Sequence, residues 1–164
     1  MWRFLGGFFS CFCVILWLTR PTEALRLKIS WGEKVDLSEN IFRGRVVLVK
    51  SYWNPEKTLV YTDVKVLVDE YLKGDGPKEI TVNLPGGTVG EITQWVSDTP
   101  QFDVGSYYVI LLESSGQVTG GPDGVYLLKG EDGDRFLIWL RAYIGGDPKV
   151  SKEGPPATPR LQRK

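Results

Sequence analysis

The segment Val60–Leu72 restricts the fold more than any other part of the sequence, because its polarity alternates with a period of two. From Val60 to Val68 every second residue is Val or Thr, and the residues between them are Tyr, Asp, Lys and Leu. This alternation is typical of a strand with one buried face. At about 3.3 Å per residue the strand would extend ~40 Å, which is too long to stay flat on a small domain. We therefore expect it to coil around a core, as barrel strands do.

Several other segments are also predicted to be strands. Ile41–Trp53 precedes the alternating segment, and the Asn-Pro pair in the intervening Asn54–Lys57 predicts a hairpin turn. Tyr107–Leu112 is uniformly apolar, which suits a strand buried on both faces. Asp132-Gly133 predicts a tight turn between the last two strands. The remaining predicted strands are Glu79–Leu84, Val125–Lys129 and Arg135–Leu140.

Helices contribute little to this prediction. No long segment carries an apolar stripe with a 3.6-residue period, and we expect only a helical turn within Asp36–Phe42, capped by Asp36 or Ser38. Six strands separated by turns predict an all-β fold, a small antiparallel barrel or sandwich. Closing the sheet into a barrel would remove its exposed edges.

The first 24 residues have the pattern of an export signal. Trp2 and Arg3 are followed by the apolar run Phe4–Leu18, and then by a polar stretch that ends in Ala24. We predict cleavage after Ala24 and a secreted or periplasmic protein. The run is short for a membrane span, which takes ~20 apolar residues. The alternatives are an uncleaved anchor, or a lipid attached to Cys11.

The residue counts exclude several classes of protein. The chain has no His, so it cannot carry a Ser-His-Asp or Cys-His catalytic system or a His zinc site. Cys11 and Cys13 both lie in the leader, so we expect the mature chain to have no disulfide. The 20 basic and 20 acidic residues give zero net charge, which argues against nucleic-acid binding.

The C-terminal segment Gly145–Lys164 is predicted to be disordered. It contains four Pro and three Gly, which do not sustain helix or strand. Its excess of cations could contact an anionic surface. The simpler alternative is a solvated terminus with no specific function. The predicted domains are therefore the signal peptide (1–24), a β domain (27–144) and a tail (145–164).

The order of several short motifs resembles a family of small exported bacterial proteins, mostly uncharacterised, whose genes often accompany secreted metalloproteases. The motifs run from Phe42-Arg43-Gly44-Arg45-Val46-Val47 through Leu72-Lys73-Gly74 to Pro85-Gly86-Gly87 with Gly90, and on to Pro100, Phe102 and Gly105. More distantly, the strand order is similar to the OB-type barrel of netrin-like domains and tissue inhibitors of metalloproteinases. The resemblance implies an OB-like barrel and a protein partner such as a secreted metalloprotease. The inhibitors' mechanism needs an N-terminal Cys, and the predicted mature N-terminus is Leu25.

Groups that could carry chemistry are few. The loop Pro85–Gly90 lacks the Gly-Lys-Ser/Thr ending of a phosphate loop, so it is predicted to be a glycine turn. Asp63 and Asp69 would lie about 20 Å apart on one strand, too far for a glycosidase pair. Glu131–Asp134 lacks the length of a calcium loop. We therefore expect no enzyme, no metal and no cofactor.

The aromatic residues and the long connection Gly87–Gly105 give the only signal for a binding site. Connections of this length are often functional, and exposed Trp and Tyr are typical of binding hot spots. We predict a recognition surface for a protein partner, such as a secreted protease or a cell-envelope component, on a monomeric domain. Carbohydrate binding by stacked rings is the alternative, and a carboxylate hydrolase is a third. The rings could instead only cap the open ends of a barrel. The predicted residues are Tyr52, Trp53, Gly86, Gly87, Gly90, Trp95 and Phe102.

The predicted cleavage site can be tested by mass spectrometry of the protein secreted by its native host. We expect the intact mass of residues 25–164, with no disulfide and no lipid. A first residue other than Leu25 would show that the predicted site is wrong, and an added acyl mass would point to Cys11 instead.

Overall fold

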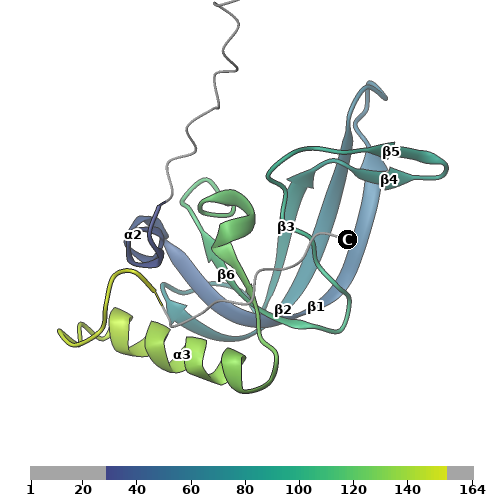
Figure 1. The fold of residues 1–164 in the computed structure, drawn as a ribbon. Helices are drawn as coiled ribbons and strands as arrows, with labels where there is room; N and C mark the ends of the chain where they lie inside the picture. The colour runs from purple at the N-terminus through teal and green to yellow at the C-terminus, as the bar shows by residue number, and fades with distance from the viewer. Residues whose placement is uncertain (1–28, 155–164) are drawn as a thin grey trace, which may run out of the picture.

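The computed structural model describes residues 29–154, which form a mostly β domain with two α-helices (Figure 1). The predicted signal peptide and both Cys lie outside the described residues. The elements, in chain order, are α2 (Trp31–Leu37), β1 (Asn40–Trp53), β2 (Val60–Lys73), β3 (Glu79–Pro85), β4 (Gly87–Val89), β5 (Ile92–Gln94), β6 (Tyr107–Leu112), the 3-10 turn η1 (Gly121–Gly124), β7 (Val125–Leu127) and α3 (Gly130–Ile144).

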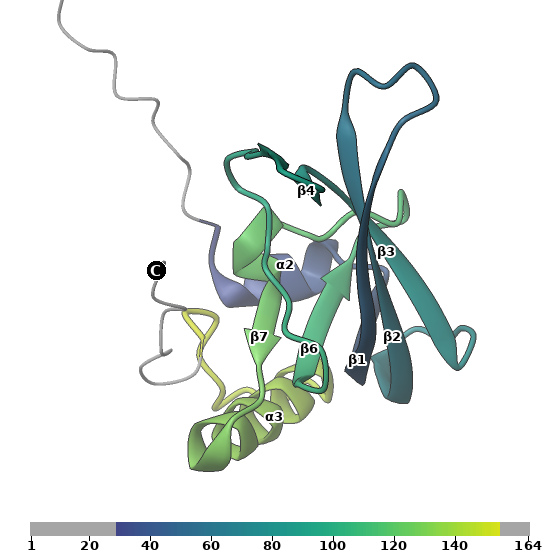
Figure 2. The ribbon, with the colours of Figure 1, turned by 90° about the vertical axis from the view of Figure 1, so that its right-hand side faces the viewer.

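Five strands form one antiparallel sheet in the order β3-β2-β1-β6-β7, and β4 pairs with β5 in a separate hairpin. The mostly antiparallel β fold and the long β1–β2 hairpin are confirmed. The predicted closed barrel is wrong for the described residues, because β3 and β7 lie at opposite edges of the sheet and do not pair. Three register shifts along β1 and β2 accompany the curvature of the sheet (Figure 2). The three-residue β7 is short, and α3 follows it in place of another strand.

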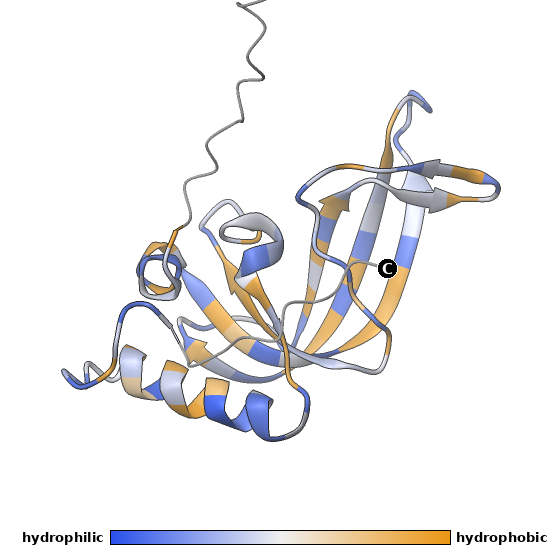
Figure 3. Cartoon of the chain, in the orientation of Figure 1, coloured by the Kyte–Doolittle hydropathy of each residue, from blue (hydrophilic) through white to orange (hydrophobic). Residues whose placement is uncertain are grey.

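Each face of the curved sheet contributes side chains to its own hydrophobic core. The alternation of β1 sends Phe42 and Val46 to one face and Ile41 to the other. Figure 3 shows apolar residues on the strands and on the side of α3 that faces the sheet. The first core consists of Phe42, Val46, Val64, Val66, Val82, Leu84, Tyr108, Ile110, Leu112 and Val125. The second core, between the sheet and the helices, consists of Val35, Ile41, Val109, Leu111, Tyr126, Phe136, Trp139 and Leu140.

The predicted strand Arg135–Leu140 is wrong, since these residues belong to helix α3. Its apolar side chains Phe136, Leu140 and Tyr143 recur at helical spacing and pack into the second core. Asp132 and Gly133, predicted to form a hairpin turn, lie in the first turns of the helix. Gly133 favours a close approach of the helix to the segment after β7, because a Cβ there would lie 3.0 Å from the Leu128 Cα, a tight contact.

The other predicted helix lies earlier in the chain than expected. Helix α2 begins at Trp31 and ends before Ser38, whereas the prediction placed a turn at Asp36–Phe42. Ser30 is the N-cap: its hydroxyl accepts from the Glu33 amide at 3.2 Å, and the Glu33 carboxylate accepts from the Ser30 amide at 2.8 Å. This reciprocal capping box satisfies donors at the helix start and fixes where α2 begins.

Residues 145–154 of the predicted tail belong to the described chain, and residues 155–164 lie outside it. No helix or strand forms in the described part, as predicted, yet it folds back onto the second core. Val150 packs against that core, and the Trp139 Nε1 donates to the Ser151 carbonyl at 3.2 Å. The Lys152 carbonyl accepts from the Gly32 amide at 3.0 Å, so this segment connects α3 with α2.

The stability of the domain should depend on the aromatic stack of the second core. Phe136 is fully buried and stacks on Tyr126 at 3.7 Å between ring centroids. Phe136→Ala should lower the free energy of unfolding by about 3–5 kcal/mol, measured by urea denaturation, because it removes a buried ring and leaves a cavity. Ile138→Ala is the matched control on the same helix, where the side chain is 70% exposed, and it should change stability by less than about 0.5 kcal/mol. Equal effects would contradict this description of the core.

Candidate functional site

The β1–β2 hairpin extends past the rest of the sheet and forms a free end of the domain (Figure 1). β6 pairs with β1 only from Asn40 to Arg45, whereas β2 stays paired with β1 as far as Trp53 opposite Val60. The second half of β1 therefore lacks β6 as a neighbour. The short β4–β5 hairpin crosses this end instead.

The turn of the hairpin is held by one side chain. The Asn54 carboxamide oxygen accepts from the backbone amides of Thr58 at 2.8 Å and Leu59 at 2.9 Å. The Asn54 amide donates to the Leu59 carbonyl at 2.8 Å, which closes the loop. These bonds explain the predicted Asn-Pro turn, because Asn side chains satisfy turn backbone that has no strand partner. The turn leaves Leu59 44% exposed beside the start of β2.

Residues 86–95, which include β4 and β5, form a projecting segment that we call the arm. Two hydrogen bonds to Val60 attach its two ends to β2. The Gly86 amide donates to the Val60 carbonyl at 2.7 Å, and the Val60 amide donates to the Gln94 carboxamide oxygen at 2.6 Å. Both ends of the arm are therefore fixed to the same residue of the sheet.

A chain of hydroxyl groups lies under the arm. The buried Thr62 hydroxyl donates to the Gly86 carbonyl at 2.7 Å and lies 2.8 Å from the Ser51 hydroxyl. The Ser51 oxygen accepts from the Thr88 amide at 3.3 Å. Gly87 sits directly on these two hydroxyls, with a positive φ of 135°, and a Cβ there would collide with both. The glycines predicted from the sequence thus permit a close approach between the arm and the hairpin.

The structure brings only some of the predicted site residues together. Gly86 and Gly87 form the base of the arm, and Gly90 lies in its β4–β5 turn. Trp53 is partly buried next to Asn54, opposite Val60. Trp95 follows β5 directly and is 69% exposed. These residues share one end of the domain.

Tyr52 and Phe102 are placed elsewhere. Tyr52 lies between Ser51 and Trp53 on β1, so strand alternation directs its ring to the face away from the arm. There its hydroxyl accepts from the Asn83 carboxamide at 2.8 Å, and Asn83 also donates to Asp63 at 2.7 Å. Phe102 packs edge-on against Tyr108 in the first core, with ring centroids 5.0 Å apart.

Tyr108 explains why Phe102 acts as a core residue. Burial raises the pKa of the Tyr108 phenol, so the ring stays neutral at physiological pH. Its oxygen accepts from the Asp103 amide at 3.0 Å. This contact holds Asp103 against the first core, where the neighbouring Phe102 is partly buried.

Two exposed residues of this end were not predicted from the sequence. Ile92 opens β5 and is 55% exposed, and Leu59 adjoins the arm through Val60. The signal for Leu59 was its position after the Asn-Pro turn, where an apolar residue is unexpected. Ile92 gave no signal, because one apolar residue in a loop is common. We refer collectively to Leu59, Ile92 and Trp95, three exposed apolar residues of this end, as the arm surface.

The arm surface consists of uncharged, apolar side chains. Among residues 29–154 no cluster of three or more potential His, Cys, Asp or Glu ligands could hold a metal ion. Neither α2 nor α3, the helices of the described segment, is long and apolar enough to cross a bilayer. The arm surface offers one indole ring and two aliphatic side chains, which suit recognition by contact.

Comparisons with known proteins assign no family. No family model matches the chain, and neither does any curated protein or solved structure.

The close contact between the arm and the hairpin predicts different costs for two glycine substitutions. Gly87→Ala and Gly90→Ala both place a side chain at positive φ, but only the Cβ at Gly87 meets other atoms. Gly90→Ala should cost about 1–2 kcal/mol of folding free energy, and Gly87→Ala at least about twice that, measured by thermal or urea denaturation. Equal costs would show that the arm does not rest on Ser51 and Thr62.

Proposed function

We propose that this protein is an exported, monomeric, non-catalytic domain that recognises another protein through the arm surface. The observation that carries the proposal is Trp95, which is 69% exposed on an arm with both ends attached to the sheet. Exposed apolar patches on folded domains often mark sites of protein interaction. Trp is also the residue most enriched at the centre of protein interfaces.

The attachment of the arm supports a binding role. A segment held by the Val60 and Thr62 hydrogen bonds keeps one geometry before the partner arrives. Binding then costs less conformational entropy than it would for a free loop. The arm thus presents Ile92 and Trp95 on a scaffold that is already in place.

The composition of the arm surface indicates the kind of partner. Leu59, Ile92 and Trp95 are uncharged, and Glu91 in the β4–β5 turn is its nearest exposed charge along the chain. Such a surface suits an apolar groove on the partner, bordered by polar groups. The resemblance to small exported proteins encoded beside secreted metalloproteases, and to OB-type domains, favours a secreted protease or a cell-envelope component. The mechanism would differ from that of the cysteine-dependent inhibitors.

The proposal is tested by affinity capture from the envelope and secreted fractions of the native host, with the domain immobilised. Trp95→Ala should abolish retention of the specific partner while leaving the melting temperature nearly unchanged, because the ring is mostly exposed. Ile138→Ala is the matched control, since it removes a side chain of similar exposure (70%) from α3, away from the arm. A protein retained by the wild type and by Ile138→Ala, but lost with Trp95→Ala, would be the partner.

Two results would oppose the proposal. A large fall in melting temperature with unchanged partner binding would make Trp95 a structural residue. Binding to an insoluble polysaccharide that Trp95→Ala abolishes would instead identify a carbohydrate-binding module, because an exposed indole can stack on a sugar ring.

A further inference from the structure

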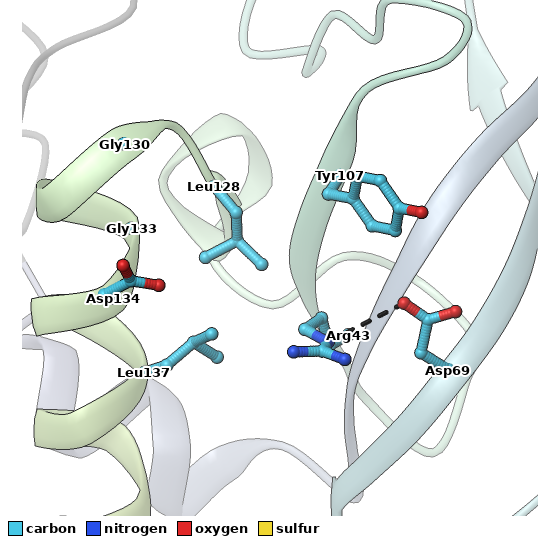
Figure 4. Close-up of a pocket in the computed structure, with 8 residues that line it drawn as sticks. All are labelled: Arg43, Asp69, Tyr107, Leu128, Gly130, Gly133, Asp134 and Leu137. Atoms are coloured by element: carbon cyan, nitrogen blue, oxygen red, sulfur yellow. Dashed lines mark ion pairs between the residues drawn. The ribbon is translucent and has the colours of Figure 1, made fainter.

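A second candidate site lies at the other end of the sheet from the arm (Figures 1 and 4). A cavity of about 410 Å³ opens between the first turns of α3 and the sheet, a volume within the range of small-ligand pockets. Figure 4 shows side chains from α3 on one wall and from β1 and β2 on the other. The cavity is lined by Arg43, Asp69, Tyr107, Leu128, Gly130, Gly133, Asp134 and Leu137.

Arg43 is the unusual group in this cavity. Its Nε is buried and makes no hydrogen bond, and it is the one such side-chain nitrogen or oxygen found in residues 29–154. The nearest carboxylate oxygen, Asp69 Oδ2, lies 3.7 Å from Nε, which is an ion pair but too long for a hydrogen bond. A buried donor without an acceptor costs about 1–3 kcal/mol, so its position in a cavity needs an explanation.

The ion pair leaves the outer end of the guanidinium available. Asp69 is paired through Nε, and no hydrogen bond joins the terminal amino groups to another described residue. A guanidinium can bind a second carboxylate with its two terminal nitrogens in parallel. Asp69 therefore positions Arg43 without occupying its full donor capacity.

The remaining walls are suited to an apolar group. Leu128 and Leu137 are partly buried on the helix side, and the Tyr107 ring is 42% exposed on the strand side. Gly130 and Gly133 add no side chains, which keeps the space open between the helix and the sheet. A ligand bound here would meet a cation at one end and carbon atoms along its length.

The carboxylates around the cavity determine which kind of anion it could bind. Asp69 and Asp134 both line the cavity, and the neighbouring Glu70 is already paired with Arg141 at 2.7 Å. The lining thus holds one cation and two carboxylates, so a doubly charged phosphate would be repelled more strongly than a monoanion bound to the Arg43 guanidinium. The site therefore favours a monoanion.

We propose that this cavity binds a carboxylate attached to a small apolar group, with the carboxylate on Arg43 and the apolar group against Tyr107, Leu128 and Leu137. Such a ligand is either a free short-chain acid or the C-terminal residue of a peptide. The proposal concerns a second site and does not depend on the function proposed for the arm surface.

Isothermal titration calorimetry of the folded domain with matched probes tests the proposal. N-acetyl-L-leucine should bind, whereas its uncharged amide and acetate should bind at least about tenfold more weakly, because each lacks one half of the recognised group. Arg43→Gln should weaken the binding of N-acetyl-L-leucine by at least about tenfold. Arg45→Gln is the matched control, since Arg45 lies two residues along the same strand, is exposed and does not line the cavity.

Two further probes distinguish the sources of the ligand. Isovalerate binding as tightly as N-acetyl-L-leucine would indicate a free acid. Tighter binding of an acetylated pentapeptide that ends in leucine, lost when its C-terminus is amidated, would indicate a peptide end. Either result supports the site.

The proposal is overturned if no carboxylate probe binds below about 10 mM, or if the amide binds as well as the acid. It is also overturned if Arg43→Gln and Arg45→Gln behave alike. Should circular dichroism show that Arg43→Gln is unfolded, Arg43→Lys retains the charge but loses the paired donors. Arg43→Lys should weaken the binding of N-acetyl-L-leucine, and Arg45→Gln again serves as the control.

Discussion

The alternation of strand β1 is the constraint on which the rest of the structure depends. Phe42 and Val46 enter the first core from one face of this strand, and Ile41 enters the second core from the other. A register slip of one residue would exchange the two faces and place polar side chains in both cores. Pairing with β2 along the full strand, and with β6 along its first half, holds the register in place.

The unequal lengths of these two pairings also separate the candidate sites. Where β6 is paired with β1, α3 covers the outer face and leaves the cavity beside Arg43. Along the second half of β1, which does not pair with β6, the arm rests on Ser51 and Thr62 and presents Trp95. One strand thus supports two surfaces of different chemistry, one charged and recessed, the other uncharged and projecting.

The sequence predicts the strands with a clear period of two, and it fails where the local signal is ambiguous. β1, β2, β3 and β6 lie close to their predicted ranges. Helix α3 was missed because Gly130–Asp134 resembles a turn, and because its apolar stripe only emerges over a longer window than Arg135–Leu140. The open sheet and the cavity depend on that helix, so neither could be predicted. Of the residues predicted for the site, the structure places Gly86, Gly87 and Trp95 at the two ends of the arm. Tyr52 and Phe102 lie elsewhere, which the sequence could not predict because aromatic character alone does not reveal the face of a strand or the depth of a loop.

The second core joins the beginning and the end of the described chain, since Val35 comes from α2 and Leu140 from α3. During synthesis, the apolar face formed by Ile41, Val109 and Leu111 has no cover until the last helix leaves the ribosome. Between the synthesis of β6 and that of α3 the nascent sheet therefore exposes this apolar face to water, and such faces promote aggregation. Completion of the domain is a late event, governed by contacts between residues that are far apart along the chain.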